Sequence, residues 1–161
     1  YLNLINKAQD YVYITTPYLI LDNEMITALT SAAKAGVDVR IITPYSPDKW
    51  YVHLVTRSYY KVLLASGIKI YEYKPGFIHS KTYIADDNYG VVGTINMDYR
   101  SLFLHFECGV WLYNSRNIQN MKDDFLATLA NCKKISKEDL KEQRWYISLV
   151  GSILRVFAPL M

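Results

Sequence analysis

Short apolar runs rich in β-branched and aromatic residues alternate along the chain with longer segments of helical periodicity. The apolar runs predict strands over residues 11–16, 37–43, 68–73, 79–85, 89–93 and 106–113. The longer segments predict helices over residues 1–10, 23–35, 50–65, 115–132 and 144–158, with a short helical turn after Asp98. This alternation favours an α/β fold in layers, with helices on both faces of one sheet. The strands between residues 79 and 113 have short connections, so this part of the sheet is expected to be mixed.

Capping residues mark the ends of several predicted helices. Asp22 and Ser136 stand where N-caps are needed, and Gly67 stands where a helix must end in a left-handed conformation. No internal repeat, low-complexity tract or linker interrupts the pattern. We therefore expect one domain over residues 1–161, in which residues 136–161 form a helical tail.

Composition and charge exclude several function classes. The chain has 161 residues, of which 51% are hydrophobic and 20% are charged, as in an ordinary globular domain. Its net charge of +3 permits an anionic partner but falls short of the basic stripe that nucleic-acid binding requires. Cys108 and Cys132 lie in no metal-ligand spacing and are expected to be reduced thiols.

The first residues indicate a segment of a longer protein. The sequence begins at Tyr1 without an initiator Met, and residues 1–5 already have the pattern of a helix interior. We find no signal-peptide pattern and no apolar run of about 18 residues that could span a membrane. The chain by itself is therefore expected to be soluble or peripheral, while membrane spans could precede it in the longer protein.

The first candidate site is the arrangement His79-x-Lys81-x4-Asp86. Residues two apart on a strand point to the same side, so the imidazole and the ammonium are expected to lie together on one face. An imidazole titrates near neutrality and can attack phosphorus or carry a proton, and an ammonium can hold phosphate oxygens. Asp86 follows in a turn, where a structural carboxylate bonded to backbone is the stronger interpretation. A His-x-Lys pair alone is more often part of a solvated face.

Two further positions make the pattern restrictive. Gly93 permits close backbone approach, and Asn96, three residues later, offers an amide to a phosphate oxygen. Glu107 follows on the next strand and is the candidate carboxylate for holding the second nitrogen of a nucleophilic imidazole. Chance agreement of the five specified residues from His79 to Asn96 is remote.

These residues resemble the signature of the phospholipase D superfamily, His-x-Lys-x4-Asp-x6-Gly-x-x-Asn. The run Gly93-Thr94-Ile95-Asn96-Met97-Asp98-Tyr99-Arg100-Ser101 and the later His105-Phe106-Glu107 resemble the bacterial cardiolipin synthase branch, as do Thr16-Pro17-Tyr18 with Asp22 and the closing Phe157-Ala158-Pro159-Leu160. The resemblance covers nearly the whole chain. It implies a phospholipase D-like α/β/α sandwich with a mixed sheet, forming one lobe, the C-terminal half, of a two-lobed enzyme.

The resemblance also implies a role for each matching residue. His79 is expected to form a phosphohistidine or to protonate the leaving alcohol, and which of the two it does stays open. Lys81 and Asn96 are expected to bind phosphate oxygens and Glu107 to orient the histidine. Ser80, Thr94, Arg100 and Ser101 are the candidates for shaping the loop or touching a headgroup phosphate. The family acts without a metal ion or other cofactor.

The activity implied is that of a cardiolipin synthase, which converts two molecules of phosphatidylglycerol into cardiolipin and glycerol. Members of this family carry two motifs, whereas this chain carries one, so the second motif must come from the missing N-terminal half or from a second copy. We expect the isolated chain to be inactive. The full-length protein is expected at the cell membrane, with the catalytic lobe on the cytoplasmic side.

Alternatives stay open at this point. One is another enzyme of the superfamily: a phosphatidylserine synthase, a phospholipase or a single-motif homodimeric nuclease, the last disfavoured by the mild charge. Another is a lobe that only binds anionic lipid or a partner. His105 could be a second imidazole at the site, although a packed neighbour is the more common role. The apolar tail from Arg144 to Phe157 could lie on a membrane surface or pack on the domain, and packing is favoured.

Overall fold

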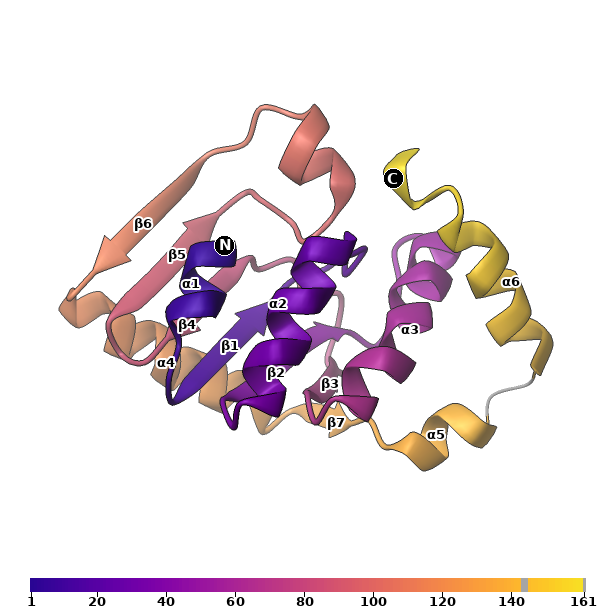
Figure 1. The fold of residues 1–161 in the computed structure, drawn as a ribbon, viewed down its shortest axis with the longest axis horizontal. Coiled ribbons are helices and arrows are strands. Elements are labelled where there is room, and N and C mark those ends of the chain that lie inside the picture. The colour runs from indigo at the N-terminus through magenta and orange to yellow at the C-terminus, as the bar shows by residue number, and fades with distance from the viewer. Residues whose placement is uncertain (143–144, 161) are drawn as a thin grey trace.

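In the computed structural model, which describes residues 1–142 and 145–160, a seven-stranded sheet has the order β6-β5-β4-β1-β2-β3-β7 (Figure 1). The strands are β1 (Tyr11–Thr15), β2 (Asp38–Pro44), β3 (Lys69–Tyr73), β4 (Thr82–Ala85), β5 (Tyr89–Gly93), β6 (Gly109–Tyr113) and β7 (Cys132–Lys134). The helices are α1 (Leu2–Lys7), α2 (Asn23–Lys34), α3 (Trp50–Ala65), α4 (Arg116–Leu129), α5 (Lys137–Glu142) and α6 (Trp145–Arg155), with a π-helical turn η1 (Arg100–Leu104) and a 3-10 turn η2 (Ala158–Leu160).

The sheet is mixed, as predicted. Strands β1, β2 and β3 are parallel to one another, and β4, β5 and β6 extend the sheet through antiparallel pairs on the β1 side. Parallel strands need a crossover, which α2 and α3 provide, whereas a short turn joins β4 to β5 and residues 94–108, which include η1, join β5 to β6. The sheet therefore changes from parallel to antiparallel pairing between β1 and β4.

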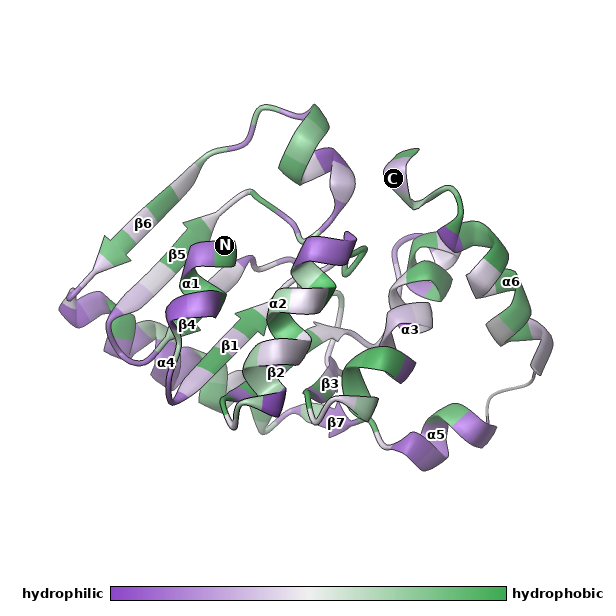
Figure 2. Cartoon of the chain, viewed as in Figure 1, coloured by the Kyte–Doolittle hydropathy of each residue, from purple (hydrophilic) through white to green (hydrophobic). Residues whose placement is uncertain are grey.

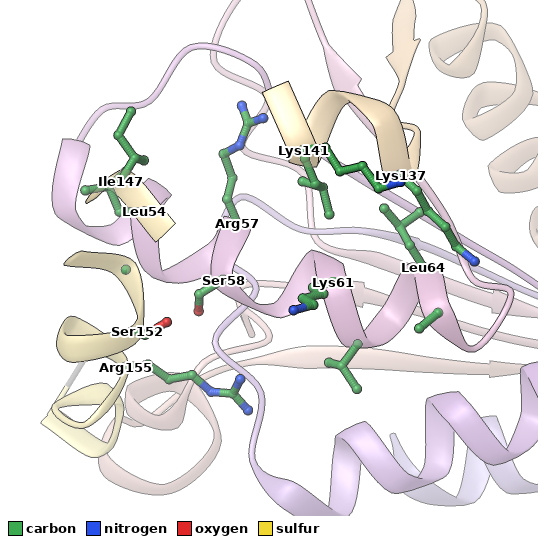
Figure 3. A pocket seen from close by; sticks show the side chains of 14 residues that line it. Leu54, Arg57, Ser58, Lys61, Leu64, Lys137, Lys141, Ile147, Ser152 and Arg155 are labelled. Carbon is green, nitrogen blue, oxygen red and sulfur yellow. The ribbon is translucent and has the colours of Figure 1, made fainter. Parts of the chain in front are cut away.

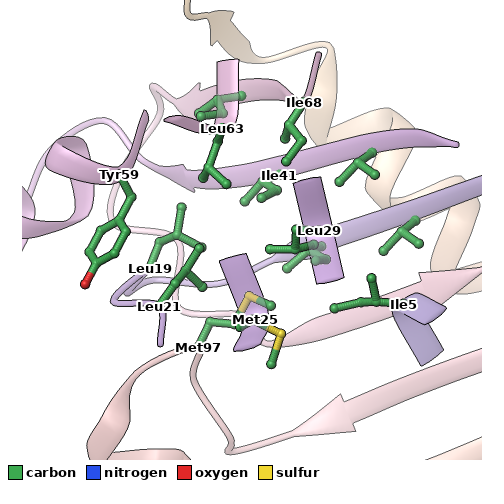
Figure 4. Packing of buried hydrophobic residues seen from close by; sticks show 14 of the residues in the cluster. Ile5, Leu19, Leu21, Met25, Leu29, Ile41, Tyr59, Leu63, Ile68 and Met97 are labelled. Atoms are coloured by element: carbon green, nitrogen blue, oxygen red, sulfur yellow. The ribbon is translucent and has the colours of Figure 1, made fainter. Parts of the chain in front are cut away.

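Helices cover both faces of the sheet. One face packs against α1, α2 and α3 around a large apolar core that includes Leu29, Ile41 and Met97 (Figure 4). The other face carries a smaller cluster, in which Ile118 and Phe125 of α4 pack on Tyr13 and its neighbours. The predicted α/β/α layering is confirmed.

The capping predictions are confirmed by hydrogen bonds and backbone angles. The Met25 amide donates to the Asp22 carboxylate at 2.7 Å at the start of α2, and the Asp139 amide donates to the Ser136 hydroxyl at 3.1 Å before α5. Gly67 has a φ of 94°, a conformation that costs a glycine little, and the chain reverses there after α3.

Several predicted boundaries are wrong. The strand predicted over 79–85 begins at Thr82, and the strand predicted over 106–113 begins at Gly109. The helix predicted over 115–132 ends at Leu129 because residues 132–134 instead pair with the edge strand β3 as β7. Pairing with an edge strand is a long-range contact that local periodicity does not encode. The predicted start of the last helix, Arg144, lies outside the described residues.

The tail packs on the domain through α6, which lies against α3 (Figure 1). A Cβ on Gly151 would lie 3.0 Å from the Leu54 carbonyl oxygen, so the glycine allows the two helices to approach closely. The Arg155 guanidinium lies 4.1 Å from the centre of the Tyr59 ring. Among the described residues, no helix has both the length and the apolar character needed to cross a bilayer.

Candidate active site

The residues from His79 to Lys81 form an extended segment that leads into β4 rather than part of the strand itself. The Gly93 amide donates to the Lys81 carbonyl at 3.3 Å, so this segment still lies beside the end of β5. His79 and Ser80 are exposed, whereas Lys81 is only 7% exposed. The motif residues therefore precede the strand instead of lying on it, with the His79 side chain exposed and the Lys81 side chain buried.

His79 is surrounded by aromatic rings. Its ring centre lies 5.7 Å from that of Phe77 and 6.5 Å from that of Tyr18, the latter in an edge-on arrangement. Partial burial and then the positive charge of Lys81 lower the pKa of His79, while Asp48 opposes the change. A lowered pKa keeps the ring neutral at neutral pH, which is the form that can act as a nucleophile.

Lys81 interacts both with His79 and with the carboxylates of Glu107 and Asp98. Its ammonium donates a 2.6 Å hydrogen bond to the carbonyl oxygen of His79. Burial lowers the pKa of Lys81, and the carboxylates of Glu107 and Asp98 oppose that change. The Lys81 charge therefore lies within electrostatic reach of both His79 and Glu107.

Glu107 is fixed by Thr94 and faces His105. The Thr94 hydroxyl donates to Glu107 Oε2 and accepts from the Cys108 amide at 3.0 Å. Glu107 Oε1 lies 3.9 Å from His105 Nδ1. The structure gives Glu107 contacts with Thr94 and His105, and not the predicted contact with His79. Its role in orienting His79 stays a prediction.

Gly93 meets the need for close backbone approach. A Cβ at this position would lie 2.2 Å from the Cys108 carbonyl oxygen, which is far inside van der Waals contact. Any side chain here would push β6 away from β5 and move Thr94 from Glu107. The glycine of the pattern is therefore required by packing between strands.

Asn96 lies in a cavity of about 280 Å³ that is also lined by Tyr18, Asp98, Ser101 and Leu160. Its Nδ2 donates to the Ser101 hydroxyl at 3.0 Å, and its Oδ1 is buried without a hydrogen-bond partner among the described residues. The Ser101 amide in turn donates to Asp98 at 2.7 Å. Buried polar atoms are normally paired, so among the described residues the Asn96 amide is left with one unsatisfied polar atom beside this cavity.

Arg100 and His105 form a pair at the rim of this cavity. Both side chains line it, and the Arg100 guanidinium lies 2.9 Å from His105 Nε2. Arginine has only donors, so Nε2 accepts and the proton of the neutral ring lies on Nδ1, toward Glu107. The interpretation of His105 as a hydrogen-bonded neighbour is supported. The His105 ring also lies next to the Glu107 carboxylate.

Asp86, a catalytic candidate in the sequence, lies away from Lys81 in the structure and makes structural contacts instead. It lies beyond the far end of β4, where its carboxylate accepts from the backbone amides of Gln9, Asp10 and Tyr11 at 2.7 to 3.0 Å. A four-residue strand separates it from Lys81, which corresponds to roughly 15 Å. The carboxylate joins the turn after β4 to the start of β1, as the structural interpretation predicts.

Sequence reasoning missed two acidic residues of the site. Asp48 accepts a 2.5 Å hydrogen bond from the Tyr18 hydroxyl, and it acts on the pKa of His79. Asp98 is 5% exposed and acts on Lys81. Both lie in loops with no regular period, and only the fold brings them next to the motif. The Ser101 amide donates to the Asp98 carboxylate, as in a helix N-cap. This contact is the one local signal that could have identified Asp98 from the sequence.

Comparison with known proteins decides the family. The family model described as "Cardiolipin synthase, PLD-like domain" matches residues 1–129. The chain belongs to the cardiolipin synthase family of phospholipase D-like domains. The boundary of the match at Leu129 coincides with the end of α4, so the family region holds β1 to β6 and every candidate site residue.

Relatives in the cardiolipin synthase family align with the whole chain. A cardiolipin synthase of Clostridium perfringens (strain SM101) is 42% identical over 162 residues, and that of Halalkalibacterium halodurans is 38% identical over 161. An uncharacterized protein of Streptococcus mutans is 47% identical over 161 residues. The alignments cover 32–35% of these relatives, so the chain spans about a third of their length.

Solved structures confirm the fold of this cardiolipin synthase family member. The phospholipase D family member Nuc from Salmonella typhimurium superposes with a TM-score of 0.73 at 18% identity, over 84% of this chain and 88% of that one. The phosphatidylserine synthase from Haemophilus influenzae gives a TM-score of 0.73 at 16% identity, over 99% of this chain and 42% of that one. At such identities the likeness concerns the fold alone.

Proposed function

We propose that residues 1–161 form the C-terminal catalytic lobe of a cardiolipin synthase, which joins two phosphatidylglycerols with release of glycerol. The observation that carries the proposal is the cation of Lys81, which lies against the His79 backbone and within electrostatic reach of Glu107 and Asp98. A buried ammonium beside an exposed, neutral imidazole is suited to a phosphodiester, because the cation neutralises the phosphate while the ring reaches phosphorus.

The reaction would proceed in two displacements. A ring nitrogen of one histidine attacks phosphorus, the bond from phosphorus to the glycerol oxygen breaks, and the other histidine of the pair donates the proton that the leaving glycerol needs. The terminal hydroxyl of a second phosphatidylglycerol then loses its proton to that same base and attacks phosphorus, which breaks the phosphorus–nitrogen bond and gives cardiolipin. Two displacements should retain configuration and give ping-pong kinetics. His79 would serve as either the nucleophile or the acid and base.

Asn96 and Ser101 would bind phosphate oxygens. A half-turn of the Asn96 amide would let the Ser101 hydroxyl donate to Oδ1 and direct Nδ2 into the cavity, because the two ends of an amide have nearly the same shape. Ser80, exposed beside His79, and the exposed Arg100 at the cavity rim are then the candidates for headgroup contacts.

The site would be completed by a second motif-bearing lobe from the rest of the longer protein. The edge strand β6 and the segment before it expose large apolar side chains on the side of the sheet nearest Glu107: Phe103, Leu104, Phe106, Val110, Trp111 and Tyr113. Phe106 is fully exposed. An edge strand with this much apolar surface is normally covered in the native assembly. The lipid substrates put the full-length protein at the cell membrane, with this lobe on its cytoplasmic side.

The test is turnover of phosphatidylglycerol labelled in the terminal glycerol by the full-length protein. Cardiolipin and free glycerol should form in equal amounts, and His79→Ala should lose transfer by roughly a thousandfold or more, as expected for a residue at the reacting atom. Lys74→Ala, an exposed lysine in the turn after β3, is the matched control. Full turnover by the His79 variant, or hydrolysis of DNA in place of lipid transfer, would refute the proposal.

The isolated chain tests the requirement for a second lobe. It should fold but be inactive with phosphatidylglycerol, and activity should return when the remainder of the longer protein is added or coexpressed. Activity that rises with the square of the concentration of the chain would instead indicate that a second copy supplies the missing motif.

A further inference from the structure

A cavity of about 760 Å³ lies away from the motif, between α3, α5 and α6 (Figure 3). Five basic side chains line it: Arg57, Lys61, Lys137, Lys141 and Arg155. The lining that the structure describes contains no Asp or Glu. A cavity of this size with one sign of charge favours an anionic ligand of substantial volume.

The charges around the cavity are only partly neutralised. Arg57 lies 3.4 Å from the buried carboxylate of Glu72, but its Nε is buried without a hydrogen-bond partner among the described residues. On α5, Asp139 is paired at 2.5 Å with Lys133, and neither residue lines the cavity. The lysine tips of α3 and α5 therefore contribute positive potential that Glu72 and Asp139 do not cancel.

Apolar side chains, with Ser58 and Ser152, form most of the remaining lining. Leu54, Leu64 and Ile147 contribute to it from α3 and α6, and Figure 3 shows them interspersed with the basic side chains. A ligand that satisfies both parts must carry a phosphate or similar anion together with a hydrocarbon portion. An anionic phospholipid meets this requirement, whereas a nucleotide or inorganic phosphate meets only half of it.

The surface next to the cavity has the character of a membrane-binding face. Leu149 and Ile153 lie four residues apart on α6 and are 51% and 54% exposed, and Val156, just after the helix, is 75% exposed. Trp145 at the start of α6 is 76% exposed, and Figure 2 shows the helix as predominantly hydrophobic. An amphipathic helix with an exposed apolar face and basic residues at its border is suited to the interface of an anionic bilayer.

We infer that the cavity between α3, α5 and α6 binds the phosphate of an anionic phospholipid while the exposed face of α6 enters the bilayer interface. This site is separate from the catalytic motif, and it deepens the proposed function by stating how the lobe meets its lipid substrate. The chain continues from α6 to Leu160, which lines the catalytic cavity together with Asn96 and Arg100. Docking through α6 would therefore hold the mouth of the catalytic cavity at the membrane surface.

The test is sedimentation of the chain with vesicles of phosphatidylcholine alone or phosphatidylcholine mixed with phosphatidylglycerol. Only the mixed vesicles should bind, and the Lys61→Gln/Lys141→Gln variant should bind them roughly 25-fold more weakly, at about fivefold for each charge removed near the surface. The matched control is Lys7→Gln/Lys34→Gln, which removes two exposed lysines from α1 and α2. An equal loss of vesicle binding in both double variants, or no loss in the Lys61→Gln/Lys141→Gln variant, would overturn the inference.

Further arms of the same assay identify the ligand and the occupant of the α6 face. A short-chain phosphatidylglycerol should displace the chain from vesicles, and inorganic phosphate at the same concentration should not. Equal displacement by the two compounds would overturn the assignment to a lipid.

Leu149→Ser/Ile153→Ser should weaken vesicle binding without changing the thermal unfolding temperature. If the variant instead converts a dimer to a monomer, the face is a protein contact and the inference fails.

The outcome for His79→Ala separates this inference from the proposed function. That variant should lose lipid transfer in the full-length protein but keep the vesicle binding of the unchanged chain. Loss of vesicle binding in the His79 variant would assign the lipid contact to the catalytic cavity and overturn the inference.

Discussion

The Lys81 ammonium donates a 2.6 Å hydrogen bond to the backbone carbonyl of His79, so the two functional groups of the motif are joined through the main chain. The Lys81 charge lowers the pKa of His79, and the carboxylates of Glu107 and Asp98 oppose the lowering of the pKa of Lys81 itself. A displacement of either residue is therefore transmitted to the other.

The first prediction concerns this pair. Lys81→Met should raise the pKa of His79, because the ammonium is one of the two causes that hold that pKa below its ordinary value. Titration of the His79 ring by NMR measures the change. Lys74→Met, which removes an exposed lysine in the turn after β3, should leave the pKa where it is. An unchanged or lower His79 pKa in the Lys81 variant would show that the two groups are not coupled.

Asp86 should prove important for stability and unimportant for the chemical step. Asp86→Asn keeps a side chain that tolerates the positive φ of 52° but loses the charge that three backbone amides contact. We expect a loss of about 2 to 3 kcal/mol in the free energy of unfolding, typical of hydrogen bonds to a charged group. Denaturant unfolding gives this value, and kcat of the full-length protein below its unfolding transition should change little. A collapse of kcat at unchanged stability would restore a catalytic role.

The Thr94 hydroxyl should be needed to hold Glu107. Thr94→Val removes a donor to that carboxylate and an acceptor for the Cys108 amide, so a loss of about 1 to 3 kcal/mol in stability is expected. Transfer by the full-length protein should fall with it. Thr94→Ser, which keeps the hydroxyl, should recover most of both quantities. Equal activity in the valine and serine variants would show that the contact has no functional role.

Glu107 itself should be essential for transfer. Glu107→Gln keeps the shape of the side chain but removes the negative charge that opposes the lowering of the Lys81 pKa. Transfer by the full-length protein should fall by about a hundredfold or more, as for the loss of one electrostatic group from an active site. Asp123→Asn, on the exposed surface of α4, is the control. Wild-type turnover by the Glu107 variant would remove the residue from the mechanism.

His53 should make the domain sensitive to acid. Burial and then the charge of Arg57 lower its pKa to about 4 from 6.5. The unfolded chain therefore binds the proton more readily, and stability is lost as the pH falls from about 6.5 to about 4, by at most roughly 3 kcal/mol at about 1.4 kcal/mol for each pKa unit. Denaturant unfolding across this window should be less pH-dependent in His53→Gln. An unchanged slope would assign the acid sensitivity to other groups.

The sequence by itself determined the order of the main elements apart from β7, the mixed sheet and the motif from which the family could be inferred. Period-two and period-3.6 patterns depend on which face of each element is buried, and side-chain direction along a chain fixes that locally. The caps at Asp22 and Ser136 could be predicted for the same reason, since each bonds within a few residues of itself. The spacing from His79 to Asn96 was sufficient to indicate the phospholipase D superfamily.

Only the tertiary structure decided how these residues are arranged. Lys81 is buried and bonds to the His79 carbonyl, Asp48 reaches the site from the loop before α3, and Asp86 lies at the opposite end of β4. The pairing of β7 with β3 and the basic cavity between α3, α5 and α6 likewise join segments that lie far apart in the sequence. Such contacts depend on the relative placement of packed elements, a quantity to which no local pattern of apolar and polar residues is sensitive.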